Sequence, residues 1–256
     1  DAIIHLVRCF DTDKIQHVNN KVNPVEDFET IKTEILLSDI ETIQKKLEKS
    51  KKKLLSEKEV SILEKSLEML NNGNDLSSLE QSSITFLNQI GLLSLKPKII
   101  VCNVDEKTLT ESNDHTKNIK KTYPSEKIIT ICADIEDQLS SLEAEEKSKF
   151  MKEIGLEKMG INKLIKEGYN LLGLETFFTS GKEESRAWTV KKNTLAPVAA
   201  GVIHTDFEKK FIRAEAVNTD DFIKFGSAEK CKENGKLRIE GKDYIVKDGD
   251  VLNFRF

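Results

Sequence analysis

The chain has 256 residues, of which 38% are hydrophobic and 33% are charged, and its formal net charge is −4. No run approaches the ~20 consecutive apolar residues that span a bilayer, and no signal-like apolar core lies near residue 1; this excludes an integral membrane protein and predicts a soluble, cytoplasmic one. The four cysteines are far apart and form no C-x-x-C pair, so we expect reduced thiols and no disulfide scaffold.

Three short, β-branched apolar runs predict strands at residues 2–7, 98–102 and 128–132. Each run is continuous and does not alternate with polar residues, which is typical of strands covered on both faces in a parallel sheet. Helical spacing of apolar residues follows at 136–152 and 160–172. The fold class predicted for this part is therefore α/β with a parallel sheet.

A highly charged helical segment lies between the first two predicted strands. Asn23 followed by Pro24 is a good helix start, and apolar residues at spacings of three and four continue to Lys53. A second helix is expected around 60–70, and a third at 76–90. This pattern favours an antiparallel helical hairpin or coiled coil, with packing on the sheet as ordinary core helices as the alternative.

From residue 174 the pattern changes to short strands separated by turns, around a single helix expected at 220–232. This composition predicts a small α+β domain. The expected strands are 186–190, 211–217, 236–239, 244–246 and 251–256.

Polar residues follow the second and third predicted strands of the N-terminal sheet. Asn103-Val104-Asp105-Glu106 comes directly after one, and Cys132-Ala133-Asp134 after the other. Ligands of parallel α/β sheets lie at the carboxyl ends of strands, where an Asn amide can be presented to a nucleotide base. In GTPases the corresponding motif is Asn-Lys-x-Asp. Glu106 is one methylene longer than that Asp and Val104 replaces the Lys, so we expect weakened selectivity for guanine; structural strand-to-helix turns are the alternative.

Two further features carry weaker functional interpretations. His17 follows the first predicted strand in a polar loop, where it is either a solvated surface histidine or a group that reaches a ligand. Phe207 to Arg213 is a basic and aromatic stretch that either contacts RNA or forms a strand edge with its phenylalanines in the core. A denser set of lysines near the expected hairpin tip is either a contact surface for a partner or a solubilising run: Lys45, Lys46, Lys49, Lys51, Lys52 and Lys53.

Taken together, ordered segments along essentially the whole chain resemble the Obg-like ATPase family (YchF type), which are P-loop NTPases related to translation factors. The matching segments are Val7-Arg8-Cys9-Phe10, His17-Val18, Val22-Asn23-Pro24, Asn103-Val104-Asp105-Glu106, Arg186-Ala187-Trp188-Thr189, Ala199 to Glu208, Phe211 to Glu215 and Gly241 to Val251.

The resemblance implies three domains. Residues 1–22 and 94–173 would be the remaining part of the OBG-type nucleotide-binding domain, 23–93 the helical coiled-coil insertion, and 174–256 a TGS domain, which is a ubiquitin-like β-grasp module. It also implies Mg²⁺-dependent hydrolysis of ATP in preference to GTP, and association with the ribosome through its large subunit and rRNA.

The resemblance also implies site residues. Asn103, Val104 and Glu106 fall on the family's altered base-specificity motif, and Cys132 and Ala133 on the loop that touches the base. His17 matches the family's candidate for positioning the attacking water, a role that orients water more than it removes a proton.

The phosphate-binding motif G-x-x-x-x-G-K-[ST] does not occur among the 256 residues. That motif supplies the phosphate cradle and a Mg²⁺ ligand, so we expect this chain alone to be inactive and the metal ligands to lie in a preceding part. The apolar run at residue 2, with no turn or cap before it, likewise leads us to expect further sequence ahead of Asp1. The alternative is a non-catalytic coiled-coil and β-grasp module that binds the ribosome, RNA or protein.

Overall fold

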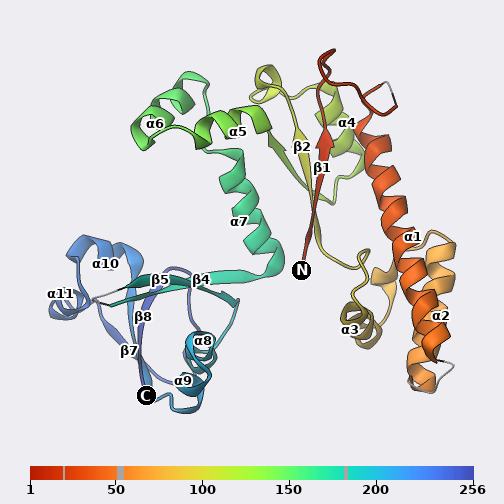
Figure 1. Ribbon diagram of the computed structural model, residues 1–256. Coiled ribbons are helices and arrows are strands. Elements are labelled where there is room, and N and C mark those ends of the chain that lie inside the picture. The colour runs from red at the N-terminus through yellow and green to blue at the C-terminus, as the bar shows by residue number, and fades with distance from the viewer. Residues whose placement is uncertain (20, 51–54, 182–183) are drawn as a thin grey trace. The chain divides into compact units, whose positions relative to one another are not determined.

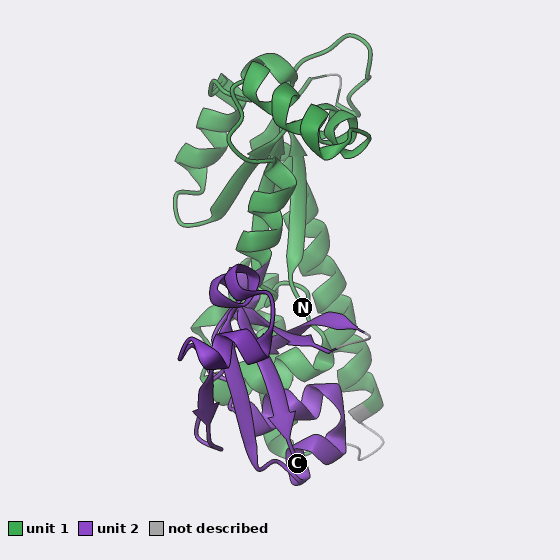
Figure 2. Cartoon of the chain, turned by 90° about the vertical axis from the view of Figure 1, so that its left-hand side faces the viewer, with its two compact units in different colours: residues 1–168 green, residues 169–256 purple. Residues whose placement is uncertain are grey.

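The structure is a computed structural model that describes residues 1–19, 21–50, 55–181 and 184–256. The chain divides into two compact units, residues 1–168 and residues 169–256 (Figure 2). Each unit has its own sheet, as Figure 1 shows, and its own buried core.

The first unit contains a three-stranded sheet in the order β1-β2-β3, formed by β1 (Ile3–Arg8), β2 (Lys98–Asn103) and β3 (Lys127–Ile131). Both strand pairs are parallel, which confirms the predicted parallel sheet. Strand β2 is covered on both faces, as its continuous apolar run predicts. The same prediction is wrong for β1, because Ile4 and Leu6 are each 57% exposed and only the face with His5 and Val7 is buried.

Helices follow the strands in this unit: α4 (Asp114–Thr122), α5 (Ala133–Ser140), α6 (Ala144–Glu153) and α7 (Gly160–Leu172). Helix α7 confirms the helix predicted at 160–172. The single helix predicted at 136–152 is wrong, because Glu143 has extended backbone angles (φ −68°, ψ 159°) and starts α6 as a separate helix. Helix α4 was not predicted, although Asn113 gives it a side-chain cap by accepting from the Thr116 N–H.

The helical segment between β1 and β2 consists of α1 (Pro24–Ser50), α2 (Glu57–Asn71), the short helix η1 (Leu76–Ser78) and α3 (Gln81–Ile90). Helices α1 and α2 pack side by side (Figure 1). Ser56 and Glu59 form a reciprocal capping box at the start of α2, in which each side chain accepts from the other residue's N–H. The third predicted helix, 76–90, is interrupted because Leu79 and Glu80 are extended.

Helix α1 takes part in two separate cores. Phe28, in its second turn, is buried with Val7 and Ile100 in the core of the β1–β3 sheet. Ile43, four turns further along, is buried instead with Leu63 and apolar residues of α2, η1 and α3. The start of α1 therefore packs on the sheet, and its remainder packs within the helical segment.

The second unit contains a five-stranded mixed sheet in the order β5-β4-β8-β6-β7. Strand β4 pairs with β8 in parallel, and the other neighbouring pairs are antiparallel. Phe177, Phe211 and Phe254 lie in its core. The strands are β4 (Leu174–Ser180), β5 (Ser185–Lys191), β6 (Arg213–Asn218), β7 (Arg238–Glu240) and β8 (Asp250–Arg255).

Two predictions for this unit are wrong, and strand β4 was not predicted. Within the described chain, residues 244–246 form only an isolated bridge, between Ile245 and Leu195, and not a strand. The single helix expected at 220–232 is split because Gly226 adopts a left-handed conformation (φ +80°). The unit contains α8 (Ala196–Ile203), α9 (Thr205–Lys209), α10 (Thr219–Phe225) and α11 (Ala228–Glu233).

Candidate functional site

The loops that follow β2 and β3 are joined directly to each other. Asn103 Oδ1 accepts a hydrogen bond from the Ala133 backbone N–H at 3.0 Å. The Val104 N–H donates to the Ile131 carbonyl oxygen at 2.8 Å. The structure therefore brings the two sequence-predicted base-binding segments together at the carboxyl ends of neighbouring parallel strands, the edge where ligands of such sheets bind.

The bond to Ala133 also determines which way the Asn103 amide points. Because a backbone N–H can only donate, the Asn103 atom that faces it is the oxygen, and the amide NH₂ points elsewhere. Within the part of the chain that the structure describes, no group accepts from that NH₂. Asn103 thus holds the second loop with one end of its amide and keeps two donors for a ligand.

The other predicted residues differ in exposure. Glu106 and Ala133 are exposed, whereas Val104 and Cys132 are each only 2% exposed and belong to the core of the sheet. Burial raises the pKa of the Cys132 thiol, and the negative charges of Asp134 and Glu106 raise it further. The thiol is therefore neutral, and the Glu106 carboxylate lies close enough for its negative charge to contribute to the raised pKa of the thiol.

The loop after β1 is organised by a residue that the sequence analysis did not single out. The Arg8 guanidinium donates to three backbone carbonyl oxygens of this loop, those of Phe10, Thr12 and Ile15. Asn113 Nδ2 ties the start of the same loop to α4 by donating to the Cys9 carbonyl at 2.6 Å. Arginine at a strand end is a weak sequence signal, because most such residues are solvated.

His17, at the far end of this loop, is bonded through both ring nitrogens. Its Nδ1 accepts from the Asn19 N–H at 3.2 Å, and its Nε2 lies 3.0 Å from Asp27 Oδ2 in the first turn of α1. Since Nδ1 accepts, the proton must be on Nε2, which donates to Asp27. The described structure therefore attaches His17 to α1, and Nε2 must leave Asp27 before it can donate to anything else.

Two further histidines and the phenylalanines of the 207–213 stretch make contacts within the protein. His115 lies in α4, with Nε2 2.9 Å from Asp11 Oδ2. His5 packs within β1 and is 8% exposed. Phe211 is buried and Phe207 packs against the same core, which favours the structural interpretation of that stretch.

The structure describes only some of the lysines near the predicted hairpin tip. Lys45 forms an ion pair with Glu41 on α1, while Lys51, Lys52 and Lys53 lie outside the described residues. Among the residues that the structure describes, no group of three or more His, Cys, Asp or Glu side chains could hold a metal ion. No helix in those residues is long and apolar enough to cross a membrane.

Comparison with known proteins shows which family has this arrangement. The chain is 43% identical over 268 residues to the ribosome-binding ATPase YchF of Escherichia coli O157:H7, and 42% identical over 268 residues to that of Bacillus subtilis (strain 168). Both alignments cover 100% of this chain and 73% of the relative. The chain belongs to the YchF family.

The comparison of structures identifies the same family as the comparison of sequences. The structure of the Schizosaccharomyces pombe YchF GTPase superposes with a TM-score of 0.82 at 32% identity, covering 100% of this chain and 72% of that one. Residues 174–256 match the family model YchF-GTPase_C, described as a protein of unknown function (DUF933). The α/β unit and the mixed-sheet unit thus both follow the YchF arrangement.

Proposed function

We propose that this chain is the base-recognising and ribosome-contacting part of a ribosome-associated ATPase. Its relatives carry the name ribosome-binding ATPase YchF, and the chain aligns with them over its whole length. The observation that supports nucleotide binding most directly is the Asn103–Ala133 hydrogen bond, since it places an amide with free donors between two loops at the ligand-binding edge of the sheet.

The base is recognised by complementary donors and acceptors. The Asn103 NH₂ would donate to a ring nitrogen of a purine, and the exposed Glu106 carboxylate would accept from an exocyclic amine. Ala133 leaves room for the base beside the backbone. Because Glu106 is longer than the Asp of guanine-specific sites, selectivity for guanine should be weakened, and the name of the relatives, ribosome-binding ATPase, supports a preference for ATP over GTP. The buried Val104 side chain contributes by packing the loop, with Cys132 as its counterpart on the other loop.

His17 would position the attacking water, which requires its release from Asp27. The neutral imidazole has its proton on Nε2, so it can donate one hydrogen bond to a water or a phosphate oxygen. In a loose phosphoryl-transfer transition state such a group orients the nucleophile and stabilises charge, with little proton abstraction. Asp27 would hold the ring ready until the loop moves.

The phosphates and Mg²⁺ need partners that these residues do not supply. The motif G-x-x-x-x-G-K-[ST] does not occur in the sequence, and the described residues present no cluster that would hold the ion. We therefore propose that Mg²⁺, which would neutralise phosphate charge, is not held by this chain, and that the chain alone binds ATP weakly and does not hydrolyse it.

The helical segment and the second unit are proposed as the ribosome-contacting parts. Helices α1 and α2 would form the coiled-coil insertion at 23–93, and the mixed sheet at 174–256 a TGS domain with a β-grasp fold, beside a nucleotide-binding domain at 1–22 and 94–173. Lysines of the helical segment and Lys209 and Lys210 would contact rRNA phosphates of the large subunit. Such a protein works in the cytoplasm.

The test is a chimera that joins this chain to the part of the E. coli relative that it does not match. In the chimera, His17→Ala should slow ATP hydrolysis by ten-fold or more with little change in ATP affinity, whereas Asn103→Ala should weaken affinity for both ATP and GTP. His204→Ala, a change in the second unit, is the matched control and should alter neither. Equal turnover of the His17→Ala chimera would remove His17 from the mechanism.

Ribosome binding is tested separately by cosedimentation of this chain with large ribosomal subunits. Binding that weakens steeply with salt supports contacts to rRNA phosphates. A chimera that binds ribosomes but neither binds nor hydrolyses ATP would favour the alternative function, a non-catalytic interaction module.

A further inference from the structure

A groove of about 360 Å³ borders strand β3, which is the last strand in the sheet order β1-β2-β3. Four consecutive residues of the strand, Lys127 to Thr130, line it together with residues of α4 and α7. Side chains of consecutive strand residues point to opposite faces of a sheet, so a groove that contacts all of them lies beside the strand and not only against one face. The groove therefore follows the free edge of β3.

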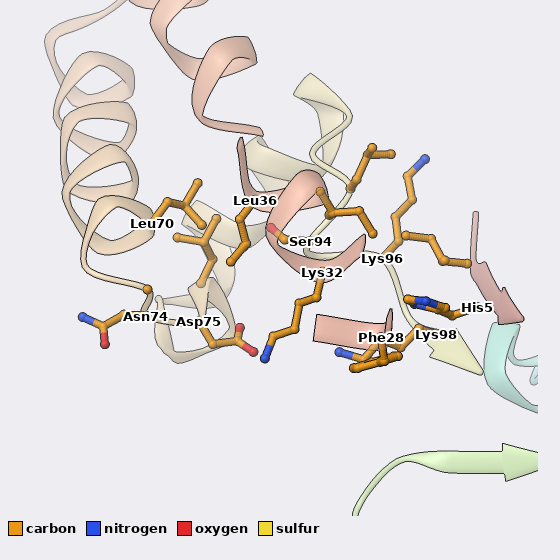
Figure 3. A pocket seen from close by; sticks show the side chains of 15 residues that line it. His5, Phe28, Lys32, Leu36, Leu70, Asn74, Asp75, Ser94, Lys96 and Lys98 are labelled. Carbon is orange, nitrogen blue, oxygen red and sulfur yellow. The ribbon is translucent and has the colours of Figure 1, made fainter. Parts of the chain in front are cut away.

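The cavity shown in Figure 3, between α1 and β1, has the contrasting pattern. There β1 contributes Ile3 and His5, which are alternate residues, and the His5 ring packs against Phe28 with centroids 4.5 Å apart. Alternate residues share one face of a strand, so that cavity lies against a face of β1. The groove at β3 differs because it also borders the edge of its strand.

Two residues of β3 direct their backbone groups toward this edge. In a parallel pair each residue turns its N–H and its C=O to the same side, and neighbouring residues alternate. The Ile131 carbonyl accepts from the Val104 N–H at 2.8 Å, so Ile131 faces β2 and Ile128 and Thr130 face away from it. No hydrogen bond of these outward N–H and C=O groups occurs among the residues that the structure describes, and both residues are partly exposed. Such groups are a template for pairing with another strand.

The side chains around the groove carry an excess of positive charge. Four lysines and two carboxylates line it: Lys120, Lys127, Lys158, Lys163, Glu136 and Glu167. Both carboxylates already have partners in the protein, the Gly160 N–H for the first and the Lys127 ammonium for the second. The other three lysines are exposed and form no ion pair within the described part of the chain. The groove therefore favours an anionic partner, although the whole chain has a net charge of −4.

An acidic peptide fits these groups better than a nucleic acid or a second copy of the chain does. Phosphate groups accept from N–H groups, but they have no donor for the outward carbonyl oxygens of Ile128 and Thr130. A second copy that paired symmetrically along β3 would set its lysines against these lysines, and like charges opposed across a strand pair are destabilising. An extended acidic segment supplies both backbone donors and acceptors for the edge and carboxylates for the lysines.

We propose that the edge of β3 is a docking site for an extended, acidic segment of a partner protein, which would add a strand to the sheet. Its backbone would pair with Ile128 and Thr130. Helix α4 packs in the same core as Ile128, and α7 begins against Ile131 on the other face. Because side chains of the added strand alternate between the faces, its carboxylates would meet Lys120 of α4 on one face and Lys163 of α7 on the other.

The probe is the end-blocked peptide Glu-Glu-Val-Glu-Glu-Val-Glu, which has carboxylates on both faces when it is extended. Its binding to this chain is measured by fluorescence anisotropy of a labelled copy and by hydrogen exchange at single amides. We expect saturable binding that weakens with salt, and slowed exchange at Ile128 and Thr130. A peptide methylated at every backbone nitrogen keeps the charge without the donors, and a peptide with lysine for glutamate reverses the charge. Each should bind at least about ten-fold more weakly.

Two substitutions on α7 decide whether the groove is the site. Lys163→Glu changes an exposed lysine of the groove and should weaken peptide binding by about ten-fold or more. Lys166→Glu, an exposed lysine of the same helix that does not line the groove, should change the affinity by less than about two-fold. The proposal is overturned if the peptide shows no saturable binding, if the methylated peptide binds equally well, or if Lys163→Glu leaves the affinity unchanged. It is also overturned if self-association of the chain, or a single-stranded RNA, slows exchange at Ile128 and Thr130 as much as the peptide does.

Discussion

Asp39 holds the helical segment to the strand that carries the base-binding motif. Its carboxylate, in the middle of α1, is 1% exposed and accepts from the N–H groups of Leu93 and Ser94 at 2.8 and 2.7 Å. These amides lie just before β2, 54 and 55 residues away along the chain. The substitution Asp39→Ala removes both bonds and leaves two N–H groups without their acceptor.

The loss of stability expected for Asp39→Ala follows from the two hydrogen bonds that the substitution removes. A hydrogen bond to a charged group contributes about 1.5–3 kcal/mol, and the two bonds together about 3–5 kcal/mol, after allowing for the desolvation of the carboxylate that the variant no longer has to bury. This is a large share of the ~5–15 kcal/mol that stabilises an ordinary domain. Asp39→Asn should lose less, because its amide oxygen can still accept one of the two bonds.

The assay is urea unfolding followed by circular dichroism, combined with hydrogen exchange at the Leu93 and Ser94 amides. We expect a loss of about 3–5 kcal/mol for Asp39→Ala and fast exchange at both amides. Glu34→Ala, an exposed change on the same helix, should stay within about 0.5 kcal/mol of the parent chain. A loss below about 1 kcal/mol for Asp39→Ala, with both amides still protected, would refute the reasoning.

The remaining predictions concern packing, pH and thiol reactivity. Gly160→Ala should destabilise by roughly 1–3 kcal/mol in urea unfolding, because its new Cβ would lie 2.7 Å from Ile131 Cγ2, whereas Gly168→Ala on the same helix meets nothing within 4 Å and should stabilise by up to about 1 kcal/mol. Equal changes in the free energy of unfolding for Gly160→Ala and Gly168→Ala would contradict this expectation. The pKa of His5 is lowered in the folded state, so as the pH falls the unfolded chain binds a proton at this residue before the folded chain does. The free energy of unfolding should therefore decrease as the pH drops below about 6.5, and His5→Gln should make this decrease with pH smaller. All four cysteines are buried, so a thiol reagent should label them fully only in denaturant, and rapid labelling of the folded chain would argue otherwise.

The sheet and the long helices could be predicted because their signals are local. The three parallel strands and the strands of the second unit that were predicted, apart from 244–246, begin and end within two residues of the expected positions. Helix breaks were harder to predict. Residues 136–152 have helical periodicity throughout, but α5 ends at Ser140 and α6 begins after the extended Glu143, a break that no glycine or proline signals.

The proximity of the two candidate base-binding loops could be predicted from the sequence, whereas the residues that hold the neighbouring segments in place could not. Asn103 and Ala133 follow strands, and strand ends in a parallel sheet converge, so their proximity follows from sequence position. Asn113 and Asp39 act through bonds to backbone groups far along the chain, and Arg8 acts through bonds to the carbonyl oxygens of its own loop. Such partners leave no pattern of spacing, because any backbone carbonyl or N–H can serve whatever its side chain.

Helix α1 joins two places that are far apart in the first unit. Its first turn carries Asp27, the partner of His17, and its 27 residues extend for ~40 Å into the helical segment. For a rigid helix of that length, a tilt of about 10° at its base displaces the far end by ~7 Å. The geometry of α1 therefore enlarges any small rotation at its first turn, where Asp27 meets His17, into a displacement of the far end of the helical segment.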